Sequence, residues 1–321
     1  MTNNDPSPDN KAPSKSGELS KSDNTPTVAV VVLNWNNYED TAACLRSLTN
    51  VSYSETEIYV ADNGSTDGSG EQLAAEFPEH EFVFNGENLG FAAGCNPAID
   101  RALSHGAEYV LLLNNDAQVK PNFLRPLVQT AETHERVAAV GGIILDESGN
   151  IRSAGGKFYP TLTLLRHRTD PADTVYETKF ISGGMILLSS EFINEVGGLN
   201  ENYFFGMEDE ELAWEAQRRD WQLLIDPRSK IIHEGGASAA KQSPFRYYHD
   251  TRNRLTFATT NLPAIRLLIF IIFFSLTRFI RSVQWGIRGQ REYLHATASA
   301  VLDHAKDADY RMVDDFNDYK T

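Results

Sequence analysis

The stretch Tyr109-Val-Leu-Leu-Leu-Asn-Asn-Asp-Ala-Gln-Val119 joins a short apolar run to three consecutive polar side chains. The run at residues 109–113 is too short for a typical helix and has the composition of a strand buried on both faces. In an open α/β sheet, ligands bind in the crevice outside the carboxyl ends of the strands. The polar residues 114–116 are therefore expected to lie where a ligand binds.

Asp116 is the metal-binding candidate at this strand end, with Asn114 and Asn115 beside it. Its carboxylate offers the hard oxygen that Mg²⁺ and Mn²⁺ prefer. These ions commonly take only one or two protein carboxylates together with substrate phosphates. The alternative is a plain turn that caps the helix after Pro121, because Asn-Asn-Asp is also ordinary turn chemistry.

The same unit of apolar strand, polar tip and helix precedes this stretch three times. The strands are expected at residues 28–33, 57–61 and 81–84, and the helices at residues 38–48, 70–77 and 91–104, with a further helix at 121–134. Strands that alternate with helices of this length are typical of a parallel sheet with right-handed crossovers. The sequence therefore predicts an α/β fold with a mainly parallel sheet flanked by helices.

The polar tips of these strands should converge on one edge of the sheet. Asp62 is placed to accept a hydrogen bond from a nucleobase or ribose, and Trp35 to stack on a base, while Gly64 and Gly90 permit tight turns near a ligand. Asp62 could equally be an Asx turn or helix cap, and Trp35 could be simple packing. No GxGxxG follows the first strand and no GxxxxGK[ST] occurs, so dinucleotide-binding and P-loop fingerprints are missing.

The regular alternation stops after Val137. Further strands are expected at residues 138–145, 151–159, 179–189, 222–225 and 229–232, and a helix is expected within 204–219. Glu208 and Asp209 open that helix, where the macrodipole favours acidic side chains, and dipole complementation is the simplest interpretation of the pair. His233 follows the last strand, although a lone histidine is more often structural than a ligand.

Several of these segments occur in an order typical of one enzyme family. Asn34-Trp-Asn36, Asp62-Asn-Gly-Ser-Thr-Asp67, Asn88-Leu-Gly-Phe-Ala-Ala-Gly-Cys-Asn96, Asn114-Asn-Asp116, Glu208-Asp209 and His233 resemble the motifs of glycosyltransferase family 2, and its rhamnosyltransferase-like branch is the closest likeness. The resemblance covers about residues 27–262. It implies a GT-A fold and inverting transfer of a sugar from a nucleotide-sugar donor, with Mg²⁺ or Mn²⁺ as cofactor.

The resemblance also implies a role for each matching residue. Donor binding is expected of Asn34, Trp35, Asn36, Asp62, Asn88, Gly90, Asn96, Asn114 and Asn115. By the same likeness Asp116 and His233 would hold the metal, Asp209 would be the general base, and Glu208 and Glu211 would lie on the acceptor side. Asn114 occupies the first position of the DxD motif, so Asp116 alone should carry the metal charge. Glu211 stands where an aspartate is often found.

Composition limits the other function classes. The formal charge of −15 argues against nucleic-acid binding, which needs a basic face. Cys44 and Cys95 form no disulfide framework and suit buried filler positions. Residues 1–25 have almost no apolar content and predict a disordered tail without a signal peptide. The catalytic domain at residues 26–262 is therefore expected to face the cytoplasm.

The C-terminal region has a different character. Residues 246–291 contain eight arginines and one acidic residue, Asp250, and they enclose an apolar run at 267–276. Ten helical residues span roughly 15 Å, half of the ~30 Å hydrocarbon core, so residues 263–291 predict an amphipathic helix lying in the membrane interface rather than a span. A helix packed on the catalytic domain or on a second copy is the alternative. Residues 292–321 predict a polar, acidic tail, helical or loose.

The proposed chemistry suits these residue types without the family likeness. Sugar transfer must neutralise a departing nucleoside diphosphate and deprotonate the acceptor hydroxyl, for which one metal site and one base suffice. A nucleotidyltransferase would also need metal carboxylates, and a non-catalytic sugar-binding module is a third possibility. The family resemblance implies that an enzyme at the cytoplasmic face of the cell membrane, peripheral or monotopic, would extend a lipid-linked saccharide for a surface glycan or for protein N-glycosylation.

Overall fold

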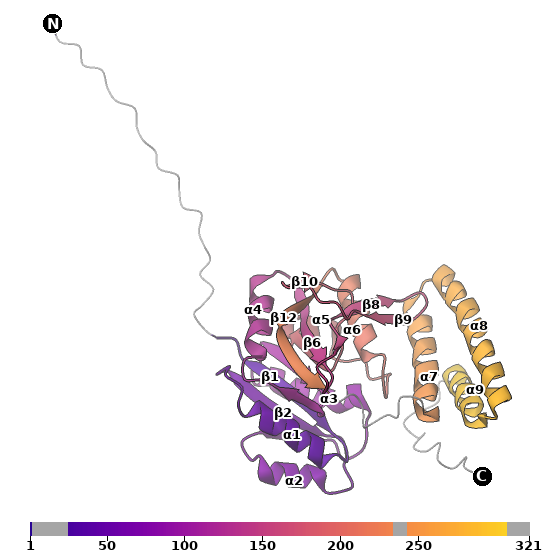
Figure 1. Ribbon diagram of the computed structural model, residues 1–321, viewed down its shortest axis with the longest axis horizontal. Helices are drawn as coiled ribbons and strands as arrows, with labels where there is room; N and C mark the ends of the chain where they lie inside the picture. The colour runs from indigo at the N-terminus through magenta and orange to yellow at the C-terminus, as the bar shows by residue number, and fades with distance from the viewer. Residues whose placement is uncertain (2–24, 234–242, 307–321) are drawn as a thin grey trace.

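Apart from Met1, the computed structural model describes residues 25–233 and 243–306 of the chain. These residues form a ten-stranded sheet, a separate two-stranded sheet and nine helices. Figure 1 shows helices on both faces of the large sheet and the last three helices grouped to one side of it. The predicted disordered tail falls almost entirely outside the described residues.

The first half of the chain builds the parallel part of the sheet. Its strands are β1 (Val28–Asn34), β2 (Thr56–Asp62), β3 (Glu81–Phe84) and β4 (Tyr109–Leu113), and its helices are α1 (Tyr38–Leu48), α2 (Ser69–Glu76) and α3 (Phe91–Ser104). The strands lie in the order β4-β1-β2-β3 and all run in one direction. The α/β prediction is confirmed, and all five residues of β4 are buried as expected.

Apolar side chains fill both faces of this sheet because successive residues of a strand point to opposite sides. Val31 packs in one cluster with Ile99 of α3, and the adjacent Val30 packs in another with Leu45 of α1. Two-sided burial explains the near-continuous apolar strands. It also leaves the strand ends as the places where polar side chains can face a ligand.

The second half of the chain adds antiparallel neighbours to the sheet. Its elements are β5 (Ala117–Val119), α4 (Leu124–Thr133), β6 (Val137–Leu145), β7 (Ile151–Ser153), β8 (Gly156–Tyr159), β9 (Leu164–His167), β10 (Tyr176–Glu177), β11 (Met185–Ser189), α5 (Ser190–Val196), α6 (Glu208–Arg218) and β12 (Gln222–His233). β11 lies between β4 and β6 and is antiparallel to both, whereas β12 is parallel to β6. The start of β11 and the ends of β4 and β12 therefore meet at one edge.

Four of the predicted strands were wrong in detail. The strand expected at 151–159 breaks into β7 and β8 at Gly155, whose φ of +80° does not belong to an extended strand. The strand expected at 179–189 begins only at Met185, because Gly183 turns its N–H to the Asp209 carboxylate. The two strands expected at 222–232 are one strand with an irregularity between Ile225 and Lys230.

The C-terminal helices are α7 (Pro244–Asn261), α8 (Ala264–Arg288) and α9 (Arg291–Lys306). The segment predicted as a polar tail is therefore a packed helix as far as Lys306, and the rest of the tail lies outside the described residues. Tyr248 of α7 donates a 2.8 Å hydrogen bond to Asp303 of α9, and small alanines such as Ala296 and Ala300 let the two helices approach. α7 thus packs against both other C-terminal helices, and its Phe257 contacts Phe158 of β8 in the two-stranded sheet.

Candidate active site

Asn34 and Asp62 end the neighbouring strands β1 and β2 and lie directly opposite each other. The Asn34 Nδ2 donates to Asp62 Oδ1 at 2.8 Å, while Thr41 Oγ1 donates to the Asn34 carbonyl oxygen at 2.9 Å. Ser65 adds hydrogen bonds to both oxygens of Asp62 from its backbone N–H and its hydroxyl. Asn34 therefore fixes Asp62, and the Asx-turn interpretation of Asp62 holds within its own loop. A contact from Asp62 to a nucleotide stays a prediction.

Trp35 and Asn36 follow β1 at the same edge. Trp35 is 47% exposed, so the packing alternative does not describe it, and its ring is accessible to a base. Asn36 adopts a left-handed φ of 48° and accepts a 2.7 Å hydrogen bond from the Thr66 N–H. The first two loops are thereby tied together.

Asn63 was not assigned a role from the sequence, yet it organises the third loop. Its Nδ2 donates to Asn88 Oδ1 at 2.8 Å and to the Gly90 carbonyl at 3.0 Å, and its Oδ1 accepts from the Leu89 N–H. A Cβ on Gly90 would lie 2.3 Å from the Phe204 carbonyl oxygen, so this glycine serves a close approach of protein backbone rather than of a ligand. The φ of +83° at this position also favours glycine over residues with a side chain. Gly64 similarly avoids the backbone of Glu87.

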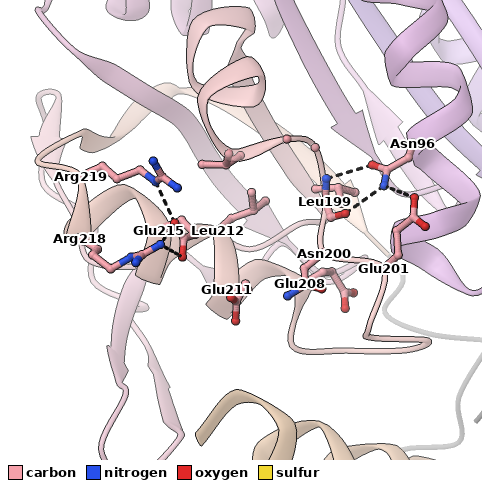
Figure 2. A pocket seen from close by; sticks show the side chains of 13 residues that line it. Asn96, Leu199, Asn200, Glu201, Glu208, Glu211, Leu212, Glu215, Arg218 and Arg219 are labelled. Atoms are coloured by element: carbon pink, nitrogen blue, oxygen red, sulfur yellow. Dashed lines mark hydrogen bonds and ion pairs between the residues drawn. The ribbon is translucent and has the colours of Figure 1, made fainter. Parts of the chain in front are cut away.

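Asn96 does not join the strand ends. Its amide donates to the Leu199 carbonyl at 2.9 Å and to Glu201 at 2.8 Å, and its carbonyl accepts from the Leu199 N–H at 3.0 Å (Figure 2). Both polar groups of Asn96 are thus occupied by the loop before α6. These bonds give Asn96 a structural role, and donor binding by Asn96 stays a prediction.

Asp116 and His233 come together where β5 pairs with β12, although they are far apart in the sequence. Neither segment alone shows a pair of metal ligands. The Asp116 Oδ1 lies 2.8 Å from His233 Nε2, and Asn114 Nδ2 lies 3.0 Å from the same nitrogen. Asn115 turns away and donates to Thr41 Oγ1 at 2.9 Å. If His233 has only a structural role, that role is to pair with Asp116, and the structure contains this contact.

The same pair has the chemistry of a small divalent-metal site. One carboxylate oxygen and one imidazole nitrogen suit Mn²⁺ or Mg²⁺, with the remaining positions left to phosphate oxygens and water. Within residues 25–233 and 243–306 no group of three or more His, Cys, Asp or Glu side chains could hold a metal. Any ion here would therefore depend on Asp116 and His233 together with a bound donor.

Asp209 reaches the same edge through the start of β11. The Gly183 N–H donates to Asp209 Oδ2 at 2.6 Å, and a Cβ on Gly183 would lie 2.2 Å from the other carboxylate oxygen. The adjacent Gly184 accepts from the Asn114 N–H at 3.4 Å, and its missing side chain would lie 3.9 Å from the His233 ring. The pair of glycines therefore connects Asp209 with the Asp116–His233 pair.

Burial raises the pKa values of the acidic residues that open α6. The pKa of Asp209 is raised by burial and partly lowered again by the Gly183 N–H. The pKa of Glu208 is raised by burial and by repulsion from Asp209, and burial raises the pKa of Glu210 to about 7. We expected the helix dipole to favour ionisation of Asp209, but desolvation outweighs that effect. A raised pKa is the condition for a base that accepts a proton near neutral pH.

Glu208 and Glu211 do not face the Asp209 side of the helix. Both line a pocket of about 430 Å³ between α6, Asn96 and the loop at 197–201 (Figure 2). Glu211 is buried and accepts hydrogen bonds from Tyr203 Oη at 2.9 Å and from Asn261 Nδ2 at 3.2 Å. These bonds give Glu211 a structural role, and its acceptor-side role stays a prediction. Among the residues that the structure describes, one buried carboxylate oxygen of Glu208 has no hydrogen-bond partner.

Comparison with known proteins places this geometry in a family. The sequence signature described as Glycosyl transferase family 2 matches residues 29–197, more than half of the chain. The chain belongs to glycosyltransferase family 2. It is a glycosyltransferase, and the family resemblance drawn from its motifs is confirmed. The nucleotidyltransferase and sugar-binding-module interpretations are set aside by this assignment.

Three named relatives are similar over most of their length. An N-acetylglucosaminyl-diphospho-decaprenol L-rhamnosyltransferase of Mycobacterium tuberculosis is 25% identical over 61% of this chain and 72% of its own. The dTDP-rhamnosyl transferase RfbF of Shigella flexneri is 24% identical over 77% of this chain and 85% of its own. The low-salt glycan biosynthesis hexosyltransferase Agl10 of Haloferax volcanii is 23% identical over 71% and 74%.

Solved structures share the GT-A fold. A mannosyltransferase from Pyrobaculum calidifontis in complex with GDP-Man and Mn²⁺ aligns with a TM-score of 0.53 at 14% identity, over 89% of each chain. GalNAc-T7 with UDP, GalNAc and Mn²⁺ aligns with a TM-score of 0.55 at 17% identity, over 75% of this chain. This chain spans only about half of the GalNAc-T7 chain, 52%. The likeness establishes the fold, a mixed, mainly parallel sheet with flanking helices.

Proposed function

We propose that this glycosyltransferase moves a sugar, with inversion, from a nucleotide-sugar to a hydroxyl of a lipid-linked saccharide, and that it needs a divalent metal ion. The observation that carries the proposal is the pair of backbone contacts made by Gly183 with Asp209 and by Gly184 with Asn114. It brings the Asp209 carboxylate and the Asp116–His233 pair to one edge of the sheet. A base and a group that can hold a phosphate-bound cation are the two requirements of the transfer.

The donor would lie across the ends of β1, β2 and β4. Trp35 is available to stack on the base, and Asp62 is held rigidly by Asn34 and Ser65 beneath it. Asp116 and His233 would hold Mg²⁺ or Mn²⁺ against the donor phosphates. When bound, such an ion neutralises charge that develops on the departing nucleoside diphosphate.

Asp209 would act on the acceptor. Its carboxylate takes the proton from the acceptor hydroxyl as that oxygen forms the new bond to the anomeric carbon. The bond between that carbon and the phosphate oxygen breaks on the opposite side of the ring, which inverts the configuration. The Gly183 N–H holds the carboxylate in place and supports its ionised form.

A lipid-linked saccharide is the acceptor that the relatives favour. One is named for a diphospho-decaprenol substrate and another for glycan biosynthesis. Transfer of a hexose or deoxyhexose in the assembly of a surface glycan, or in protein N-glycosylation, follows from those names as a proposal. Such an acceptor would require the enzyme to work at a membrane surface.

One face of α8 supports membrane association. Seven large apolar side chains, each at least 45% exposed, recur at a spacing of three or four residues: Ile265, Leu268, Ile272, Leu276, Phe279, Val283 and Ile287. This spacing places them along one stripe of the helix. The opposite side packs Phe270 and Phe274 against Phe257 of α7. The packed-helix alternative describes this second side, and the exposed stripe supports the proposal of membrane association.

The proposed occupant of the apolar stripe is an anionic lipid surface. Arg266, Arg281 and Arg288 are exposed on α8 and can reach headgroups while the stripe lies among acyl chains. No helix in the described part of the chain combines the length and apolarity needed to cross a bilayer. Peripheral or monotopic attachment at the cytoplasmic face remains our proposal.

The test of the proposed function is a screen of nucleotide-sugars by thermal unfolding, with and without Mn²⁺. A ligand that binds only the native state stabilises it by about 2.7 kcal/mol at a 100-fold excess over its Kd. We expect one donor class to raise the Tm only when the metal is present. The anomeric configuration of the product, measured by NMR, then tests inversion. Protection by free nucleotides without any sugar transfer to a lipid-linked acceptor would contradict the proposal.

Ile272→Glu should release the protein from anionic vesicles. The variant places a charge in the middle of the apolar stripe, whereas Gln284→Glu adds the same charge to an exposed position beside the stripe. In sedimentation with phosphatidylglycerol vesicles we expect the wild type and Gln284→Glu to bind and Ile272→Glu to remain in solution. If the stripe instead mediates a dimer, light scattering will detect a dimer that Ile272→Glu dissociates, and vesicle binding will be missing.

A further inference from the structure

Two residues with a left-handed backbone conformation precede the helix that carries Asp209. Gly206 has a φ of +81° and Met207 a φ of +84°, and Met207 forms the first capping position of α6. A left-handed conformation is easy for glycine but costs a residue with a side chain on the order of 1 kcal/mol. Such a turn persists only where surrounding contacts hold it. The contacts that hold it therefore also set where α6 begins.

Asn253 of α7 supplies two of those contacts. Its Nδ2 donates to the Phe205 carbonyl at 3.0 Å and to the Gly206 carbonyl at 2.8 Å. Asn253 is 1% exposed, and within the described residues its Oδ1 has no hydrogen-bond partner. The hydrogen bonds of this side chain are thus directed at the turn. The turn lies just before α6, whereas Asn253 comes from α7, the first of the three C-terminal helices.

The turn leads directly to the active site. The Met207 carbonyl accepts the first helical hydrogen bond, from the Glu211 N–H at 2.9 Å, and Asp209 lies within that first turn of α6. Asp209 has little freedom at its other end, because Gly183 offers no room for even a Cβ beside the carboxylate. A small shift of the helix start would therefore break the 2.6 Å contact with the Gly183 N–H.

We propose that Asn253 is a positioning residue, which holds the turn at 205–207 and through it places the Asp209 carboxylate for proton transfer. The inference rests on the proposed role of Asp209. Arg252, the neighbouring residue of α7, supports the same loop by donating to the Asn202 carbonyl at 3.1 Å. One of the C-terminal helices, α7, thus completes the geometry of the proposed base.

The test compares Asn253→Asp and Asn253→Ala with Tyr248→Phe in the full chain. Asn253→Asp keeps the size of the side chain but places a carboxylate oxygen, which cannot donate, against the carbonyls of Phe205 and Gly206. Asn253→Ala removes the donor altogether. Tyr248→Phe is the control. Tyr248 is a buried residue of the same helix, but its hydrogen bond goes to Asp303 of α9 and not to the turn at 205–207. We expect both Asn253 variants to lose about 10-fold to 100-fold in kcat with the donor KM unchanged, since an error of ~1 Å in placement can cost that much.

A second readout is the pH profile of transfer. The Gly183 N–H lowers the pKa of Asp209, so loosening that contact should move the acidic limb of the profile to higher pH in the Asn253 variants. A merely structural role would lower the Tm and the fraction of folded enzyme without moving that limb. Unchanged kcat per donor-binding molecule in both variants, or an equal loss in Tyr248→Phe, would overturn the inference.

Asp209→Asn is assayed in parallel to separate the two proposals. If Asp209→Asn transfers sugar like the wild type, the role of Asp209 is wrong whatever the Asn253 variants do. If Asp209→Asn is inactive while Asn253→Asp and Asn253→Ala keep their kcat and pH profile, only the positioning inference fails. Donor affinity, measured by thermal protection, reports in each case whether the variant has folded.

Discussion

Asp116→Ala should abolish metal-dependent nucleotide binding and sugar transfer while the fold is retained. Asp116 is the only carboxylate in the segment 114–119, and its 2.8 Å contact with His233 assembles the one carboxylate and one imidazole of the proposed metal site. Removing the carboxylate leaves His233 without the charge that attracts a divalent ion. Calorimetric titration of the nucleotide with and without Mn²⁺ measures the loss.

The control for this variant is Asp146→Ala. Asp146 also follows a sheet strand, β6, and its carboxylate accepts hydrogen bonds from Asn150 in its own turn. We expect it to bind nucleotide and turn over normally. A metal-dependent response that survives in Asp116→Ala, with transfer at the wild-type rate, would show that the ion is held elsewhere.

Asp209→Asn should lower transfer by about 10²-fold to 10⁴-fold, the range that a general base contributes. Asparagine keeps the size of the side chain and can still pair with the Gly183 N–H, but it cannot take a proton from the acceptor. Donor affinity should be unchanged, because the carboxylate is expected to act on the acceptor hydroxyl. Initial rates with saturating donor measure the effect.

The pH dependence gives the same assignment a second test. Burial raises the pKa of Asp209 above the ordinary value of about 4, and only the ionised form can act as a base. Wild-type transfer should therefore fall as the pH drops through this raised pKa, and the residual activity of Asp209→Asn should lack that limb.

Glu208→Gln serves as the control for charge at the helix start. It removes a neighbouring carboxylate that faces the pocket behind α6 rather than Gly183. If both residues merely complement the helix dipole, the two variants should show equal, small changes in stability and no loss of transfer. A large loss confined to Asp209→Asn is the result that the base assignment requires.

The local pattern of the sequence was enough to predict most elements of the parallel half. Apolar runs such as 109–113 are continuous because both faces of their strands are covered, and this signal needs no knowledge of distant residues. The polar tips at Asn34, Asp62 and Asn114 follow from the same rule, since the carboxyl ends of parallel strands meet at one edge. Weak, interrupted runs after Val137 carried no such signal, and the strands there were placed less accurately.

The roles of single polar side chains depended on the tertiary structure. Asn96 and Glu211 match motif positions, but other parts of the protein occupy their polar groups. Asn96 donates to the carbonyl of Leu199, which is distant in the sequence, and Glu211 accepts from Tyr203 in the loop before α6. Packing between helices and strands decides which group a polar side chain meets. The neighbouring residues in the sequence do not reveal that partner.

The sequence by itself determined the fold class, the family and the edge of the sheet at which we propose the site. Only the tertiary structure decided that Gly183 meets Asp209, that His233 meets Asp116 and that Asn253 of α7 bonds the turn before α6. The physical reason is one of range. Strand periodicity reflects burial of neighbouring residues, whereas these contacts join segments brought together by the antiparallel β11 and by the packing of the C-terminal helices.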